Sequence, residues 1–63
     1  MQTPTMIARD AKHDLEVWQT WDAGAQVFEL WASPECNDYI GCADTRAEAQ
    51  RIAREWLVDY ANF

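Results

Sequence analysis

The chain has 63 residues, of which 49% are hydrophobic and 13% aromatic, and its net charge at pH 7 is −6. This length accommodates a single domain, residues 1–63, and excludes a second core. Only two Pro and two Gly accompany the apolar content, which excludes a disordered chain. No stretch approaches the roughly 18 apolar residues of a membrane span, and residues 1–10 lack the apolar region of a signal peptide. We therefore expect a cytoplasmic protein without a membrane partner.

Negative charge is concentrated in the middle of the chain. Residues 13–44 carry seven Asp or Glu and no Lys or Arg, whereas residues 1–12 sum to +1 and residues 45–63 sum to zero. Soluble domains ordinarily intersperse both signs, and an acidic surface repels nucleic acid while it attracts basic protein surfaces. The sequence therefore predicts a partner protein with a basic nucleic-acid-binding surface, and no direct binding to nucleic acid.

The first dozen residues fit two structures. Thr3 and Pro4 are typical of the start of a short helix, whereas residues 6–8 suit an edge strand. Residues 15–21 and 26–32 are rich in Val, Trp, Phe and Thr, and they predict two strands. The four residues between them are typical of a hairpin loop in which Gly24 takes a positive φ.

A symmetric hairpin loop places the apolar residues of the two strands on one face. That face is expected to carry a helix, and its predicted pairs are Trp21 with Gln26, Gln19 with Phe28, and Val17 with Leu30. The alternate residues form an outward face, whose predicted pairs are Glu16 with Trp31, Trp18 with Glu29, and Thr20 with Val27.

Residues 33–38 are a loop by composition, and residues 39–43 predict a short third strand. If Tyr39 points outward, alternation places Ile40 and Cys42 on the core face.

A C-terminal helix is predicted from about Arg46 to Tyr60. Its apolar residues recur with the helical period, and they are Ala49, Ile52, Ala53, Trp56, Leu57 and Tyr60. Thr45 followed by Glu48 predicts a capping box at its start. The expected fold class is α+β, a three-stranded antiparallel sheet with this helix packed on one face.

No catalytic or metal-binding motif is recognisable. His13 is the only histidine and Ser33 the only serine, and neither has the sequence context of a catalytic triad. Cys36 and Cys42 with one histidine fall short of a zinc ligand set, and we expect a loop thiol and a core residue, respectively. The sequence therefore predicts a protein without enzymatic activity, metal or cofactor.

The candidate partner-binding residues are the carboxylates of the acidic stretch and the outward aromatic residues: Asp14, Glu16, Trp18, Asp22, Glu29, Trp31, Glu35, Asp38, Tyr39 and Asp44. Exposed aromatic residues on a sheet mark an interface, and Trp and Tyr are common at binding hot spots. Two alternatives stay open. Cross-strand aromatic pairs also stabilise sheets without a partner, and an N-terminal segment folded over Trp18 and Trp31 would bury them.

Residues 15–60 resemble the domain of HicB-type antitoxins. The resemblance lies in the strand pair, in the loop Ser33-Pro34-Glu35-Cys36, and in the junction of residues 43–49, where the family prefers Gly in place of Ala43. It implies an acidic inhibitor of a small basic ribonuclease toxin.

The small size, the acidity and the lack of a catalytic motif are similar to phage-encoded anti-CRISPR proteins. Several of these are DNA mimics, whose carboxylates stand where phosphates would. This resemblance implies an inhibitor in the bacterial host cell that presents a regular lattice of carboxylates to a type I CRISPR–Cas complex. The antitoxin function and a structural or regulatory dimer are the alternatives, and the chain is expected to be a monomer or a homodimer.

Overall fold

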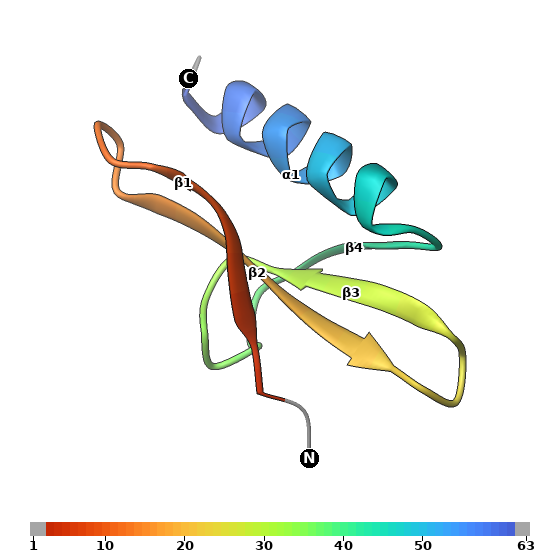
Figure 1. Cartoon of the computed structure of the whole chain (residues 1–63). Helices are drawn as coiled ribbons and strands as arrows, with labels where there is room; N and C mark the ends of the chain where they lie inside the picture. The colour runs from red at the N-terminus through yellow and green to blue at the C-terminus, as the bar shows by residue number, and fades with distance from the viewer. Residues whose placement is uncertain (1–2, 62–63) are drawn as a thin grey trace.

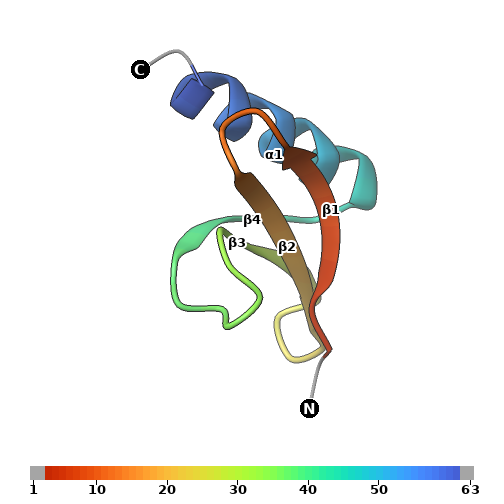
Figure 2. The ribbon, with the colours of Figure 1, turned by 90° about the vertical axis from the view of Figure 1, so that its left-hand side faces the viewer.

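The computed structural model describes residues 3–61 and shows four strands followed by one helix (Figure 1). The elements are β1 (Thr5–Asp10), β2 (Leu15–Asp22), β3 (Val27–Trp31), β4 (Tyr39–Ala43) and α1 (Arg46–Ala61). The strands form one antiparallel sheet in the order β1-β2-β3-β4. The helix packs on one face of this sheet (Figures 1 and 2), which confirms the α+β class.

The N-terminal segment forms the edge strand β1, so the predicted sheet was one strand short. The turn after β1 is held by Asp10, whose Oδ1 accepts hydrogen bonds from the backbone N–H groups of Lys12 (3.1 Å) and His13 (3.3 Å). Met6 lies opposite Trp18 and Ala8 opposite Val17, so Ile7 is an extra residue, a β-bulge.

The bulge in β1 also ties this strand to the helix. The side-chain amide of Gln50 in α1 donates a hydrogen bond of 3.2 Å to the carbonyl oxygen of Ile7. Ile7 packs against the core as well. Both contacts hold the edge strand in the sheet. The sequence of residues 5–10 predicts a strand only weakly, because it is short and its alternation is broken at Ile7.

The hairpin between β2 and β3 has a register that differs by two residues from the prediction. Trp21 lies opposite Phe28 rather than Gln26, and the two rings are 4.7 Å apart. The carbonyl of Asp22 accepts a hydrogen bond from the N–H of Gln26 (2.6 Å), and Gln26 has a φ of 58°. The positive φ predicted for Gly24 is therefore wrong, because the loop closes through Gln26.

A shift of two residues keeps every side chain on its predicted face, since side chains alternate with a period of two. Val17 and Leu30 are accordingly buried under the helix, as predicted. The observed cross-strand partners are Trp18 with Trp31, Gln19 with Leu30, Thr20 with Glu29, Trp21 with Phe28 and Asp22 with Val27.

The third predicted strand is observed as β4, but a bulge changes which of its side chains face the core. Leu30 lies opposite Gly41 and Trp31 opposite Tyr39, so Ile40 is an extra residue. Cys42 is exposed with a free thiol, and Ala43 is only 2% exposed. The prediction that Cys42 is a core residue is therefore wrong, because the bulge at Ile40 reverses the alternation.

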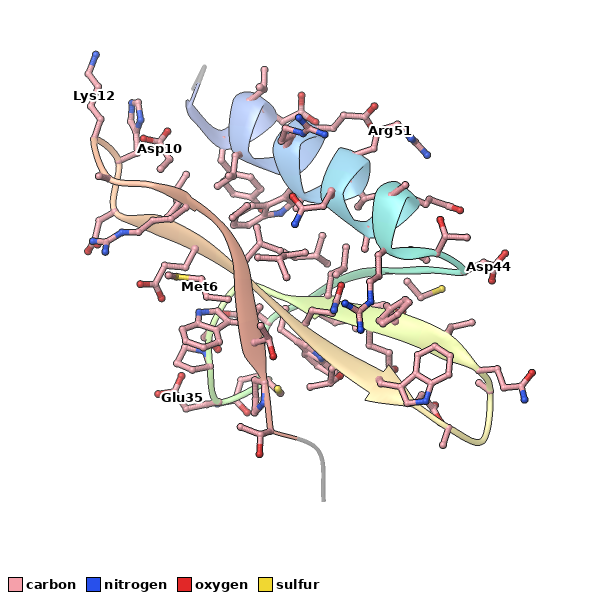
Figure 3. All side chains as sticks on the ribbon, viewed as in Figure 1. Met6, Asp10, Lys12, Glu35, Asp44 and Arg51 are labelled. Carbon is pink, nitrogen blue, oxygen red and sulfur yellow. The ribbon has the colours of Figure 1, made fainter. Side chains whose placement is uncertain are left out.

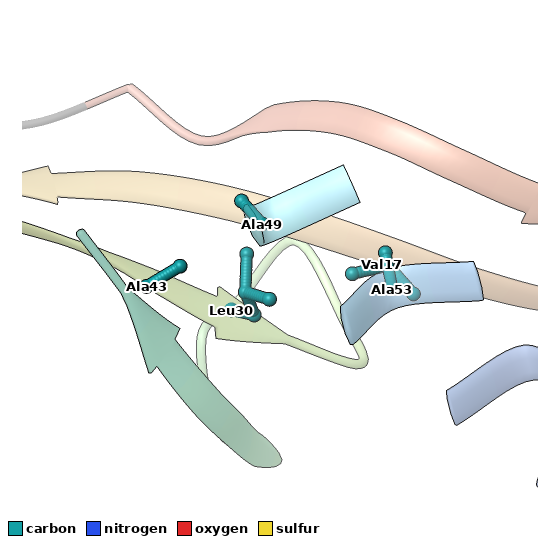
Figure 4. Close-up of a cluster of buried hydrophobic side chains, with 5 residues drawn as sticks. All are labelled: Val17, Leu30, Ala43, Ala49 and Ala53. Atoms are coloured by element: carbon teal, nitrogen blue, oxygen red, sulfur yellow. The ribbon is translucent and has the colours of Figure 1, made fainter. Parts of the chain in front are cut away.

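Among residues 3–61 the core is small and consists of five buried residues (Figure 4), Val17, Leu30, Ala43, Ala49 and Ala53. The predicted helix face is confirmed for Ile52, Trp56 and Leu57, which pack around this core. Tyr60 is 51% exposed, and its ring lies 4.4 Å from that of Trp56.

The helix begins where the sequence predicted. The hydroxyl of Thr45 accepts a hydrogen bond from the N–H of Glu48 (3.1 Å), which is one half of the predicted capping box. The helix then runs to Ala61, one residue beyond the predicted end.

Replacement of Leu30 by alanine should test the assignment of the two sheet faces. Leu30 is fully buried, so Leu30→Ala should lower the free energy of unfolding by about 2–5 kcal/mol. Met6→Ala, on the opposite face, should lower it by less than about 1 kcal/mol. Urea denaturation followed by tryptophan fluorescence measures both, and equal losses would contradict the assignment.

Candidate functional site

The sheet face away from α1, here called the outer face, carries a row of large side chains that crosses all four strands. Met6 lies opposite Trp18, Trp18 opposite Trp31, and Trp31 opposite Tyr39. Directly opposed residues of antiparallel strands point to the same face of a sheet. These four residues, one from each strand, therefore form a continuous line, which we call the outer row.

The outer row is held in place by hydrogen bonds and ring contacts within the outer face. The indole N–H of Trp18 donates to Glu16 Oε1, and that of Trp31 donates to Thr20 Oγ1, each at 3.0 Å. The ring of Tyr39 meets that of Trp31 edge-on, with centroids 5.3 Å apart. The two indoles thus have fixed orientations and satisfied polar atoms.

The outer row is accessible from solvent. Met6 is 43% and Tyr39 55% exposed, while Trp18 and Trp31 are half-buried. The N-terminal segment lies beside β2 as the edge strand β1 and does not fold over the two tryptophans. The sequence left open that the N-terminal segment buries Trp18 and Trp31. Residues 3–10 do not do so.

Three of the predicted carboxylates share the outer face with this row, and these are Glu16, Glu29 and, at the end of β2, Asp22. Glu16 precedes Trp18 by two residues in β2, and Glu29 lies between Thr20 and Cys42 in neighbouring strands. Glu16 also lies opposite Arg9 of β1. The edge strand therefore brings a positive charge next to the acidic stretch.

The other four predicted carboxylates lie in turns and loops, and these are Asp14, Glu35, Asp38 and Asp44. Asp14 lies 3.8 Å from the guanidinium of Arg9, and Asp22 Oδ1 accepts hydrogen bonds from the N–H groups of Gly24 and Ala25. Glu35 and Asp44 project from widely separated parts of the molecule (Figure 3). The predicted acidic residues are thus spread around the domain instead of forming one lattice.

The phenol of Tyr39 is biased toward its neutral form. Hydrogen bonding with Cys42 raises the pKa of Tyr39, and desolvation and Coulombic interaction with Cys42 and Glu29 act in the same direction. The phenol therefore stays a hydrogen-bond donor to higher pH than an isolated tyrosine.

The outer face includes residues that were neither predicted site residues nor predicted outward residues, and among them are Met6, Arg9 and Cys42. Met6 and Arg9 lie on β1, a segment that the sequence predicted to be either a short helix or an edge strand. Cys42 reached the outer face through the bulge at Ile40. The short run of residues 6–8 was the sequence signal for β1.

The residues considered for catalysis are not brought together. His13 Nδ1 lies 2.9 Å from Asp10 Oδ2, but the buried hydroxyl of Ser33 has no hydrogen-bond partner. Within residues 3–61, no three His, Cys, Asp or Glu side chains are grouped to hold a metal ion. In the same part of the chain, no helix is long and apolar enough to cross a membrane.

Comparison of the chain with protein-family models, with curated proteins and with solved structures gives no match. The geometry of the chain itself is therefore the only guide to its function. Three features of the chain point to a function, and these are the outer row, its flanking carboxylates and the overall acidity.

The carboxyl group of Asp10, in the turn between β1 and β2, has a shifted pKa that can be measured. The hydrogen bond from the His13 side chain, helped by backbone hydrogen bonds from His13 and Lys12, lowers the pKa of Asp10. We expect NMR titration of this carboxyl group to give a midpoint below the ordinary value of about 3.9. His13→Ala should move the midpoint upward, and an unchanged midpoint would contradict the contact.

The same shift has a consequence for stability. A carboxylate with a lowered pKa in the folded state stabilises the fold above its unfolded pKa, and this contribution disappears as the pH falls through the folded value. Asp10→Asn should therefore lower the free energy of unfolding at pH 7 and have a much smaller effect at about pH 2.

Proposed function

We propose that this chain is a non-enzymatic inhibitor that docks its outer face on a basic, nucleic-acid-binding surface of another protein. The observation that carries the proposal is the outer row, which crosses all four strands and has no element of residues 3–61 packed over it in the way that α1 covers the opposite face. Large exposed side chains that form a continuous patch are typical of an interface.

The outer row offers an area suited to protein recognition. Trp and Tyr bury about 150–250 Å² each when fully covered, which sums to about 450–750 Å² for its three aromatic residues. Because Trp18 and Trp31 are already half-buried, docking covers part of this area, and neighbouring residues of the outer face supply the rest. A standard interface buries about 800 Å² per partner. The indoles are already oriented by hydrogen bonds to Glu16 and Thr20, which reduces the entropy lost on docking.

Charge favours a basic partner over nucleic acid. The net charge of −6 attracts a positive surface from a distance, and Glu16 and Glu29 lie on the outer face to contact it. An aromatic sheet that binds single-stranded nucleic acid needs a positively charged surround, and here Arg9 is the one basic residue whose register places it beside Glu16.

A CRISPR–Cas effector complex is the first partner that we propose, because size and acidity are similar to those of anti-CRISPR proteins. The dispersion of the carboxylates favours contact through the outer face over mimicry of DNA by a lattice of all seven. The alternative partner is a basic ribonuclease toxin. The resemblance of the loop at Pro34 and of the Thr45–Glu48 cap to HicB-type antitoxins supports this alternative. A toxin gene next to the coding sequence would favour the alternative.

A pair of charge-reversed variants should locate the docking surface. The double variant Glu16→Lys/Glu29→Lys should weaken binding to a purified type I effector complex by tenfold or more, measured by competition with target DNA. The control Asp44→Lys/Asp59→Lys changes the net charge from −6 to −2 to the same extent, but at exposed residues at the two ends of α1, on the opposite side of the sheet. Equal losses in both variants would mean that only the overall charge matters.

Removal of one aromatic residue should separate binding from folding. Trp18→Thr keeps a residue suited to a strand, and it should cost about 2 kcal/mol or more of binding free energy if Trp18 is a hot spot. Unfolding should remain cooperative in circular dichroism. Light scattering on the same samples tests the dimer alternative, because a wild-type mass twice that of the variant would show that the outer face pairs two copies.

A further inference from the structure

A groove of about 450 Å³ lies where the end of the β3–β4 loop and the start of β4 meet the C-terminal half of α1. Its walls include three aromatic residues, Tyr39, Trp56 and Tyr60, and two polar residues of the loop, Asn37 and Asp38. Within the described part of the chain, no Lys or Arg lines it. The groove therefore combines aromatic rings with one negative charge.

The aromatic walls come from two different elements. Trp56 and Tyr60 are one turn apart on α1, with ring centroids 4.4 Å apart and planes inclined by 38°. Tyr39 lies at the start of β4, where its ring is braced by the edge contact with Trp31. Aromatic faces attract cations through their quadrupoles, and Trp does so most strongly.

The position of the negative charge is set by the backbone. The carbonyl oxygen of Asp38 accepts a hydrogen bond of 2.8 Å from the N–H of Ala32, which closes the loop and holds residue 38 beside the groove. The Asp38 side chain is exposed and has no ion-pair partner among residues 3–61. Its carboxylate is thus available to a cation in the groove.

We infer that this groove binds the guanidinium group of an arginine side chain from the partner protein. A guanidinium is planar and stacks on aromatic rings while it donates two parallel hydrogen bonds to a carboxylate, a combination that the compact ammonium of lysine does not reproduce. Tyr39 belongs both to the groove and to the outer row, so a partner docked on that row places its own side chains next to the groove. The inference rests on the proposed function, of which it specifies one contact.

Binding of arginine can be tested without the partner. We expect N-acetyl-arginine methylamide to shift the indole N–H signal of Trp56 in a saturable way in NMR, with smaller changes at the other three tryptophans. The citrulline analogue has the same shape without the charge and should produce no saturable shift, and the lysine analogue should bind more weakly. Equal responses to the arginine and citrulline compounds, or none to either, would overturn the inference.

Two variants within the groove and one control variant outside it assign the interaction to the groove. Asp38→Asn should weaken binding of the arginine compound about threefold, as expected for an exposed ion pair. Glu35→Gln removes a charge from the same loop outside the groove and should leave binding unchanged. Tyr39→Leu removes one aromatic wall while Asp38 remains, and it should also weaken binding. Equal affinities for all three variants would contradict the site.

These results are separable from the test of the docking surface. If the arginine compound fails to bind while Glu16→Lys/Glu29→Lys still abolishes partner binding, the groove inference is wrong and the proposed function stands. If the compound binds with the expected variant pattern while the charge-reversed variants bind the partner normally, the groove is a cation site and the outer face is not the docking surface.

Discussion

The contact between α1 and the sheet is the interaction on which the rest of the domain depends. Ala49 and Ala53 are fully buried one turn apart, so the helix backbone approaches Val17 and Leu30 with no large side chain between them. One helix covers one face of a sheet. Among residues 3–61, α1 is the only helix, and the outer face is left to solvent for that reason. A domain of this size has a small free energy of unfolding. Large apolar side chains that stay outside its core do not contribute the stabilisation that burial would give.

Much of the fold follows from local sequence patterns. The helix and its first turn were predictable because the period of the apolar residues and the Thr45 cap indicate the same element. The face of each residue in β2 and β3 was predictable from alternation, whereas the register was not, because it depends on the backbone conformation of Gln26 in the loop. The bulges at Ile7 and Ile40 were not predictable either, since an extra residue in a strand leaves no mark in composition.

The candidate site was predictable only in its aromatic part. Trp18, Trp31 and Tyr39 were placed on the outer face, and the pairing of the strands aligns them in one row. The acidic part was predicted from residues close together in the sequence, which the fold distributes over strands, turns and loops. Arg9 next to Glu16 shows most clearly why the charge of the outer face could not be predicted. That charge depends on which strand pairs with β2, and the sequence did not settle that β1 does.

The two bulges have a consequence beyond the direction of side chains. β1 and β4 are the two edges of the sheet, and each carries one bulge, at Ile7 and at Ile40. A regular edge strand offers an unbroken line of N–H and C=O groups on which another chain can extend the sheet. A bulge interrupts that line and twists the strand locally. Both edge strands of this small sheet are therefore poor templates for the addition of further strands. This favours discrete molecules over fibrils at high protein concentration.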